Sequence, residues 1–362
     1  MSERFVGLDI GAETLKLVEL IDDGGTLRWT RRHIVQHHKD PASALLPLLA
    51  TWDWPSVNGA AMCGRLARPF TLARVPEKQA RAAGFRFLGD FEPATIISIG
   101  SHGFSVLELR ANDVEVFREN SRCSQGTGNF LCQLVERFGL TVEQASELCA
   151  DVEDPAPLSG RCPVILKTDM THLANLGQNH ARILAGLYDA VAENVLVLVK
   201  PRVCPGRVAL VGGVTRARRI REQVRRYVER NGMTLLPEKE SETLFLDAIG
   251  CAVVAARQGL RDVPRLDNLL LSSQSEGLEV VPALSLSLAR VRRLPKQCLP
   301  DPDEQAASTG ELFVGLDIGS TGSKAVAVDV AFGKMVWQAY TTTSGNPVGA
   351  AQHLVRQLAE SK

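Results

Sequence analysis

Two aspartates, each followed by a glycine turn, are the residues of this chain whose type and spacing best suit chemistry. Asp9 and Asp317 each stand near the end of an apolar run, and Gly11 and Gly319 follow two positions later. Backbone amides in such a turn can approach phosphate oxygens closely, while a carboxylate can hold Mg²⁺ through water. The pattern therefore predicts two places where a nucleotide and magnesium could bind.

The two turns differ in their chemistry. The second contains Ser320, Thr321 and Lys324, whose hydroxyls and amine suit a triphosphate, whereas the first has Glu13 where Thr321 stands in the second. A carboxylate about 4 Å from a phosphate would repel it by a few kcal/mol at an effective dielectric constant of about 20. Either Glu13 points away from the phosphates or the first copy binds nucleotide weakly. We predict Asp9 and Lys16 as the catalytic pair of this copy, with Gly11 and Thr14 beside the nucleotide.

These turns belong to an internal repeat. The sequence FVGLDIG begins at Phe5 and again at Phe313, 308 residues later (313 − 5 = 308), and the same offset pairs Lys16 with Lys324. A repeat far longer than the roughly 20 to 50 residues of a solenoid indicates a duplicated domain. We expect a first module at 1–257 (one subdomain at about 1–92 plus 243–257, the other at about 93–242), a linker at 258–311, and the truncated start of a second module at 312–362.

Composition narrows the function classes. The chain has 41 basic and 41 acidic residues, so no net charge attracts it to nucleic acid or to an anionic membrane. No apolar run approaches the roughly 18 residues of a membrane-spanning helix, and the first twenty residues lack a signal-peptide core. We therefore expect a cytoplasmic protein. Its eight cysteines include no CxxC pair, which in a reducing compartment favours free thiols or a few metal ligands over disulfides.

The elements that must position these residues can be read from the apolar spacing. Residues 4–33 and 94–117 each indicate three consecutive antiparallel strands separated by turns. Between 128 and 199 the spacing becomes helical, and 208–211 is a short buried strand that ends at Gly212 and Gly213. A small-residue helix at 243–257 follows an arginine-rich helix at 216–230, whose arginines we predict to form a solvated face.

The order of these glycine motifs resembles the actin-like ATPase superfamily. The motifs are DIG at Asp9, SIG at Ser98, VGGV at Val211 and AIG at Ala248. The resemblance implies an α/β fold in which nucleotide lies in a cleft between two ribonuclease H-like subdomains. It adds Gly100, Gly212, Gly213 and Gly250 to the predicted nucleotide contacts, and the start of a second copy adds Asp317, Gly319, Ser320, Thr321 and Lys324.

Two cysteines are candidates for a metal site. Cys123 precedes a glycine-rich helix start, where the helix dipole and free amides would stabilise a thiolate, and Cys162 follows a proline-rich loop. Two cysteines cannot complete a tetrahedral site, but two from each of two equivalent subunits could hold a four-iron, four-sulfur cluster on a symmetry axis. Taken alone, two isolated cysteines are more typical of small buried apolar residues.

The cysteine motifs make the resemblance specific. Together with Cys123-Ser-Gln-Gly-Thr-Gly-Asn and Cys162-Pro-Val, the motifs from Arg4 to Arg257 resemble the ATP-dependent activators of 2-hydroxyacyl-CoA dehydratases and the ATPase subunits of benzoyl-CoA reductases. That resemblance implies ATP, Mg²⁺ and a 4Fe–4S cluster held by Cys123 and Cys162 between two protomers or tandem modules. It implies ferredoxin or flavodoxin as electron source, and a dehydratase or CoA-ester reductase as the partner that receives the electron.

The chain also departs from that family. Ser98 stands where the family usually has an aspartate, which removes a group expected to position magnesium or the attacking water. Together with Glu13, this substitution leaves open whether the first copy hydrolyses ATP. Two alternatives therefore remain: a catalytically silent regulatory half-module of a tandem activase, or a small-molecule kinase of the same fold.

Overall fold

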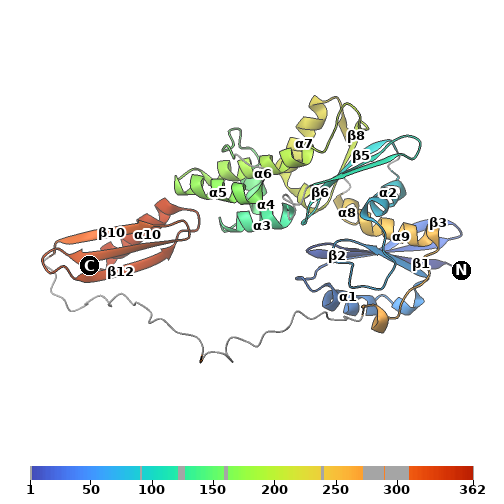
Figure 1. Ribbon diagram of the computed structural model, residues 1–362, viewed down its shortest axis with the longest axis horizontal. Helices are drawn as coiled ribbons and strands as arrows, with labels where there is room; N and C mark the ends of the chain where they lie inside the picture. The colour runs from blue at the N-terminus through green and yellow to red at the C-terminus, as the bar shows by residue number, and fades with distance from the viewer. Residues whose placement is uncertain are drawn as a thin grey trace. The chain divides into compact units, whose positions relative to one another are not determined.

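The computed structural model describes residues 2–89, 92–120, 127–158, 162–237, 240–271, 289 and 310–361. The chain divides into two compact units, one comprising Met1–Met170 and Asn179–Leu271, the other Thr171–Gln178 and Ser272–Lys362. Figure 1 shows the elements of each unit. Within the described ranges, no helix combines the length and apolar character needed to cross a membrane.

The first sheet of unit 1 is the predicted three-stranded meander with one strand added. Its order is β3-β2-β1-β4, and β1 pairs antiparallel with β2 and parallel with β4. The strands are β1 (Glu3–Ile10), β2 (Thr14–Asp23), β3 (Thr26–Gln36) and β4 (Gly59–Cys63), and the accompanying helices are α1 (Pro41–Ala50), η1 (Trp54–Ser56), α2 (Glu77–Phe87), α9 (Leu246–Gln258) and η4 (Leu266–Asn268).

Alternation along β1 and β2 gives this sheet two apolar faces. Leu8 and Leu17 pack with Leu45 and Leu49 of α1 on one face. Val18 and its neighbours pack with α9 on the other face, and Figure 1 shows α1 and α9 on opposite sides of the strands. Because successive side chains of a strand point to opposite faces, both faces of β1 are buried.

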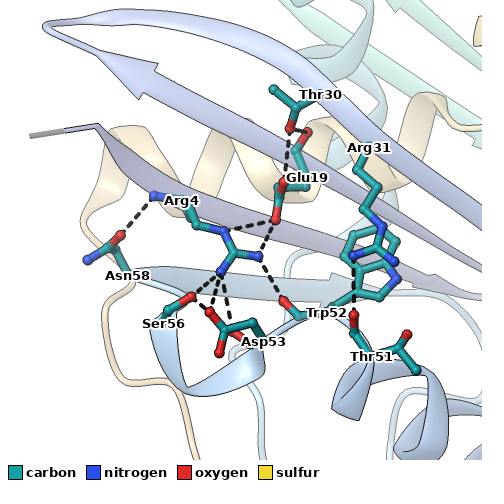
Figure 2. Close-up of polar contacts among 9 residues, drawn as sticks. All are labelled: Arg4, Glu19, Thr30, Arg31, Thr51, Trp52, Asp53, Ser56 and Asn58. Atoms are coloured by element: carbon teal, nitrogen blue, oxygen red, sulfur yellow. Dashed lines mark hydrogen bonds and ion pairs between the residues drawn. The ribbon is translucent and has the colours of Figure 1, made fainter.

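Arg4 fastens the loop after α1 to the sheet, as Figure 2 shows. Its guanidinium pairs with the buried carboxylate of Glu19, donates to the carbonyl oxygen of Trp52 at 2.8 Å, and contacts the hydroxyl of Ser56. Its backbone amide donates to Asn58 Oδ1 at 2.8 Å. A single arginine of β1 thus contacts one neighbouring strand and the segment that leads into β4.

The second sheet of unit 1 repeats this design. Its order is β7-β6-β5-β8-β9, with an antiparallel meander and β8 parallel to β5. The elements are β5 (Ala94–Ile99), β6 (Phe104–Leu109), β7 (Glu115–Glu119), α3 (Thr127–Glu136), α4 (Val142–Cys149), α5 (Pro163–Asn175), α6 (His180–Leu196), β8 (Arg207–Val211), η3 (Gly213–Arg216), α7 (Arg218–Arg230), β9 (Thr234–Leu235) and α8 (Glu240–Thr243). The two meanders built alike confirm the predicted α/β fold class.

Local signals explain where several helices begin and end. Asp40 caps α1 through Ser43, and Thr141 caps α4 in a capping box with Gln144. Such caps satisfy backbone amides that have no partner within the helix. Gly259 ends α9 in the left-handed conformation, with φ of 64°, which a glycine adopts without steric cost.

Helices α2 and α9 cross at two glycines. A β-carbon on Gly250 would lie 1.6 Å from the carbonyl oxygen of Ala80, and one on Gly84 would lie 2.1 Å from that of Leu246. Only glycine permits backbones to approach this closely. Because α2 leads from the first sheet to the second and α9 leads back, this crossing joins the two halves of unit 1.

One arginine of the arginine-rich helix α7 does not lie on the predicted solvated face. Arg219 is buried and donates to both carboxylate oxygens of Asp189 at 2.8 and 2.7 Å, and to the carbonyl oxygen of Cys149 at 2.8 Å. A buried guanidinium requires such partners because its desolvation is costly. The prediction of a solvated face is therefore wrong for Arg219, which ties α7 to α6 and to the end of α4.

Unit 1 extends beyond the predicted start of the linker at 258. Leu269 is fully buried in the core beneath α1, and Leu271 donates its amide to the carbonyl oxygen of Pro69 at 2.8 Å. The indole of Trp54 donates to the carbonyl oxygen of Pro264 at 2.9 Å. Apolar burial and these hydrogen bonds hold residues 259–271 on the first sheet, so the packed module continues at least to Leu271. Most of the remaining predicted linker lies outside the described residues.

Unit 2 repeats the opening meander of unit 1. It contains β10 (Leu312–Ile318), β11 (Gly322–Asp329), β12 (Met335–Thr342) and α10 (Pro347–Glu360), and the sheet order is β10-β11-β12. The first two strands pair in the same register in both copies, because Asp317 pairs with Lys324 as Asp9 pairs with Lys16. The third strand is shifted by two residues, because Val18 pairs with Arg32 whereas Val326 pairs with Gln338. Within the described residues, no strand takes the place of β4 beside β10.

Candidate functional site

A cleft of about 670 Å³ lies within unit 1 where the turns of its two sheets face each other. The first sheet contributes Asp9, Gly11, Thr14 and Lys16, and the second contributes Gly100, Gly212 and Gly213. All seven were predicted from sequence. A more apolar cavity of about 380 Å³ between α2, β8 and α7 contains none of the predicted residues, so we place the candidate site in the larger cleft.

Asp9 and Lys16 form an ion pair at the floor of the cleft. Lys16 Nζ donates to Asp9 Oδ2 at 2.8 Å, and both side chains are about 85% buried. Burial alone would lower the pKa of Lys16, but attraction and hydrogen bonding to Asp9 outweigh it and raise that pKa. Lys16 therefore remains charged and directs one positive group toward the cleft.

The glycine turn after Asp9 is held from outside by His37. The amide of Gly11 donates to Thr14 O at 3.0 Å, and His37 Nε2 lies 3.0 Å from the carbonyl oxygen of Gly11. The amide of Lys39 donates to His37 Nδ1 at 3.2 Å, which assigns the proton of the neutral ring to Nε2. The turn is therefore fixed before any ligand enters.

Glu13 lines the cleft, but its charge is paired. Lys39 forms an ion pair with Glu13 and donates to the carbonyl oxygen of Ala12 at 3.0 Å. The Glu13 side chain is one-third exposed, so solvent screens it further. The repulsion expected between Glu13 and a phosphate is thus reduced by a residue that sequence reasoning did not consider.

A second buried ion pair, Arg81 with Asp247, was missed by the sequence analysis. Arg81 Nε donates to Asp247 Oδ1 at 3.0 Å, and Arg81 Nη1 donates to Ser105 Oγ at 2.7 Å. Burial opposes the charge on Arg81, but Asp247 more than compensates and raises the pKa of the guanidinium. Arg81 thus joins α2 and α9 to β6 at the base of the cleft. The available sequence signal was an arginine next to the small residues Ala80, Ala82, Ala83 and Gly84.

Ser98 lies on the cleft wall at the end of β5, and Ser105 faces it across the pairing of β5 with β6. The serine at position 98 therefore removes a carboxylate from the cleft itself. The acids that do line the cleft include Asp9, Glu77 and Asp247. Asp9 and Asp247 are each already paired with a cation.

Gly250 occupies a different place from the one predicted for it. It lies in the crossing of α2 with α9 and is absent from the described residues that line the cleft. Its small size permits the close packing of α9 on α2.

The predicted residues of the second copy form a similar turn in unit 2. Gly319 donates its amide to Gly322 O at 3.2 Å, and Lys324 Nζ lies 3.3 Å from Asp317 Oδ2. Ser320 and Thr321 lie within this turn between β10 and β11. Unlike Asp9 and Lys16, the pair Asp317 and Lys324 is exposed to solvent.

The structure describes one of the two predicted cluster ligands. Cys123 lies outside the described residues. Cys162 is half-buried directly before α5, and its carbonyl oxygen accepts a hydrogen bond from Leu166 at 3.0 Å. Among the described residues, no group of three or more histidines, cysteines or acids could hold a metal. Cys162 is thus a ligand candidate that needs partners from elsewhere.

Two other cysteines meet beneath the cleft. Cys63 pairs across the sheet with Asp9, and its thiol hydrogen-bonds to that of Cys251. That hydrogen bond and burial raise the pKa of Cys63 well above its usual value, and burial raises the pKa of Cys251. Both thiols are therefore protonated and packed.

Comparisons with known proteins identify relatives of this chain. The sequence profile described as the BadF/BadG/BcrA/BcrD ATPase family matches residues 73–255. The chain is 27% identical to the uncharacterized protein YjiL of Escherichia coli, over 70% of this chain and 96% of that protein. It is 23% identical to a benzoyl-CoA reductase subunit of Thauera aromatica, over 69% of this chain and 92% of that protein.

Two further similarities concern dehydratase activators. The activator of lactoyl-CoA dehydratase of Anaerotignum propionicum is 28% identical, over 40% of this chain and 58% of that protein. Among solved structures, the activator of the 2-hydroxyisocaproyl-CoA dehydratase from Clostridium difficile with bound ADPNP superposes with a TM-score of 0.61 at 23% identity, covering 72% of this chain and 98% of that one. That structural likeness confirms the predicted actin-like fold.

Proposed function

The chain belongs to the BadF/BadG/BcrA/BcrD ATPase family, and we propose that it is an ATP-dependent activator. In this proposal it transfers a low-potential electron from an iron–sulfur cluster to a 2-hydroxyacyl-CoA dehydratase or a related CoA-ester reductase. Similarity to a reductase component and to a dehydratase activator supports both partner classes.

One observation carries the proposal: the cleft between the two sheets gathers glycine turns from both, with the Asp9–Lys16 pair on its floor. The turns would bind phosphates through backbone amides, and Lys16 would neutralise phosphate charge. Asp9 would hold Mg²⁺ through water. A nucleotide in this position would contact both sheets at once.

The cluster would be the source of the electron. Cys162 fits as a ligand, since its side chain is half-buried at a helix start and a thiolate is the usual donor to iron–sulfur clusters. With Cys123, it would supply two of four ligands, and an equivalent module would supply the others. A homodimer and a tandem pseudo-dimer both meet that requirement. Ferredoxin or flavodoxin would reduce the cluster again.

Anaerobic reconstitution tests the cluster. The wild-type chain should become brown and contain iron and sulfide in equal amounts, at about two irons for each chain if two protomers share one cluster. Cys162→Ala should lose the colour, while Cys132→Ala, which changes an exposed cysteine of α3, should keep it. Equal iron content in all three proteins would contradict the assignment.

A second candidate function is a nucleotide-binding half-module that does not hydrolyse ATP. The observation that favours it is the pairing of Asp9 and Asp247 with cations in a cleft where Ser98 replaces an acid. In this case the chain would bind ATP without turnover, and Ser98→Asp would add turnover. Robust ATP hydrolysis by the unmodified chain would exclude the silent module.

A further inference from the structure

The cleft of unit 1 contains acidic side chains besides those that are paired closely with cations. The described residues that line it include six acids: Asp9, Glu13, Glu77, Glu119, Glu143 and Asp247. Asp9, Glu13 and Asp247 each form a close ion pair with a lysine or an arginine. A carboxylate held in this way is a poor proton acceptor, because the paired cation stabilises its charged form. An acid that acts in place of a carboxylate at position 98 must therefore be one of the three glutamates Glu77, Glu119 and Glu143.

Glu77, the first residue of α2, lies close to the position of Ser98. Arg81 Nη2 lies 3.9 Å from Glu77 Oε2, and Arg81 Nη1 donates to Ser105 Oγ at 2.7 Å. Ser105 pairs directly with Ser98 across β5 and β6, so both serine side chains point to the same face of the sheet. One guanidinium group therefore separates the Glu77 carboxylate from this pair of serines.

The charge of Glu77 is only weakly compensated. The Arg81 guanidinium already binds both carboxylate oxygens of Asp247, so its attraction to the more distant Glu77 is shared. Partial burial raises the pKa of Glu77 against the attraction of Arg81, and the carboxylates of Asp247, Asp9 and Glu119 add to the increase. A raised pKa makes a carboxylate a better proton acceptor near neutral pH. About half of the Glu77 side chain remains exposed, so water in the cleft can reach it.

The other two glutamates belong to elements farther from Ser98 or from α2. Glu119 pairs with Ser105 from the edge strand β7, which places it two strands, or roughly 10 Å, from Ser98. Glu143 belongs to α4, which packs with α3, α6 and α7. Both are glutamates of the same cleft, so they are matched controls for Glu77.

We propose that Glu77 is the general base for ATP hydrolysis in the unit 1 cleft, where position 98 is a serine. A water molecule attacks the γ-phosphorus of ATP, the bond from that phosphorus to the β–γ bridging oxygen breaks, and ADP leaves. The Glu77 carboxylate takes one proton from the attacking water and passes it to solvent, and inorganic phosphate is the second product. This assignment rests on the proposed ATP-dependent function, and it adds the residue that activates the water.

Steady-state ATP hydrolysis by the full chain, reconstituted anaerobically with iron and sulfide, tests the assignment. Glu77→Gln keeps the size of the side chain but removes the proton acceptor, so it should lower kcat at least about 100-fold. The Kd for Mg·ADPNP, measured by titration calorimetry, should change less than about threefold. Glu119→Gln and Glu143→Gln should keep kcat within about twofold of the wild type. Thermal unfolding of each variant establishes that it is folded.

A double variant distinguishes a catalytic role from a structural one. Adding Ser98→Asp to Glu77→Gln should raise kcat at least about tenfold, because a carboxylate then stands beside Ser105 in the same part of the cleft. Unchanged kcat in Glu77→Gln, an equal loss in either control, or no recovery in the double variant would overturn the assignment.

The binding measurement separates this assignment from the proposed function. A wild-type chain that binds Mg·ADPNP but does not hydrolyse ATP would overturn the role of Glu77 and leave the nucleotide site in place. A wild-type chain that does not bind Mg·ADPNP would contradict the proposed function itself, and the role of Glu77 with it.

Discussion

At the scale of single residues, three acidic side chains that line the cleft are each paired with a cation. Asp9 pairs with Lys16, Glu13 with Lys39, and Asp247 with Arg81. The first and third pairs are buried, so removing one partner would leave a costly unpaired charge. The pair of Glu13 with Lys39 is partly exposed and can be altered without damage to the fold.

The Glu13–Lys39 pair should control nucleotide affinity. Lys39→Met should weaken ATP binding roughly tenfold, equal to about 1.4 kcal/mol, because the Glu13 carboxylate is then uncompensated beside the phosphates. Glu13→Thr, which copies Thr321, should strengthen binding. The free energy of unfolding should change by less than about 1 kcal/mol in either variant. Titration calorimetry measures the affinities, and unchanged values in both variants would refute this reading of the cleft.

The buried thiols should make the fold sensitive to alkali. An unfolded cysteine has a pKa of about 8.5, and the folded pKa values of Cys63 and Cys251 are raised. Their contribution to stability is complete below about pH 8.5 and is lost as pH rises toward the folded values, since only the unfolded chain then releases the protons. Urea unfolding between about pH 8 and 10 should show a smaller decline for Cys63→Ala/Cys251→Ala than for the wild type. Parallel declines would contradict the buried thiol pair.

At the scale of elements, the crossing of α2 with α9 connects the two sheets. Its geometry depends on Gly84 and Gly250, whose backbones touch the opposite helix. Arg81 adds an ion pair between the same two helices.

Gly250→Ala should therefore destabilise the protein by about 3 kcal/mol or more, because the added methyl would overlap Ala80 O. Gly206→Ala is the matched control, since nothing lies within 4 Å of its β-carbon. That control should change stability by less than about 1 kcal/mol. Urea denaturation measures the free energy of unfolding of the two variants. Similar decreases in both would mean that the crossing is not tightly packed.

Prediction from sequence was most successful for single elements and the turns that follow them. Asp9, Gly11 and Gly100 were found because a strand followed by a turn is a local pattern. Arg81 and Asp247 were missed because they are 166 positions apart and meet only through the helix crossing. Arg219 was missed for the same reason, since its helix looks uniformly charged until α6 places Asp189 beside it. Glycine patterns cannot by themselves distinguish a nucleotide turn from a helix contact, which explains the placement of Gly250.

At the scale of the whole molecule, the internal repeat places the same strand sequence in two surroundings. Gly7 is enclosed by α9, whereas Gly315 faces open space. Gly7→Ala should destabilise unit 1 by about 1–3 kcal/mol or more, and Gly315→Ala should be neutral or stabilise unit 2 by up to about 1 kcal/mol. Amide hydrogen exchange measures each unit separately. Equal losses in the two variants would mean that both glycines are enclosed.

In the proposed function, ATP in the unit 1 cleft drives an electron from a cluster to a CoA-ester enzyme. Electron paramagnetic resonance of the reduced, cluster-loaded chain mixed anaerobically with a 2-hydroxyacyl-CoA dehydratase tests it most directly. We predict that the signal of the reduced cluster disappears, with one electron transferred per cluster, only when Mg·ATP is present. Loss of the signal at the same rate without nucleotide, or its persistence with nucleotide, would contradict ATP-dependent electron transfer.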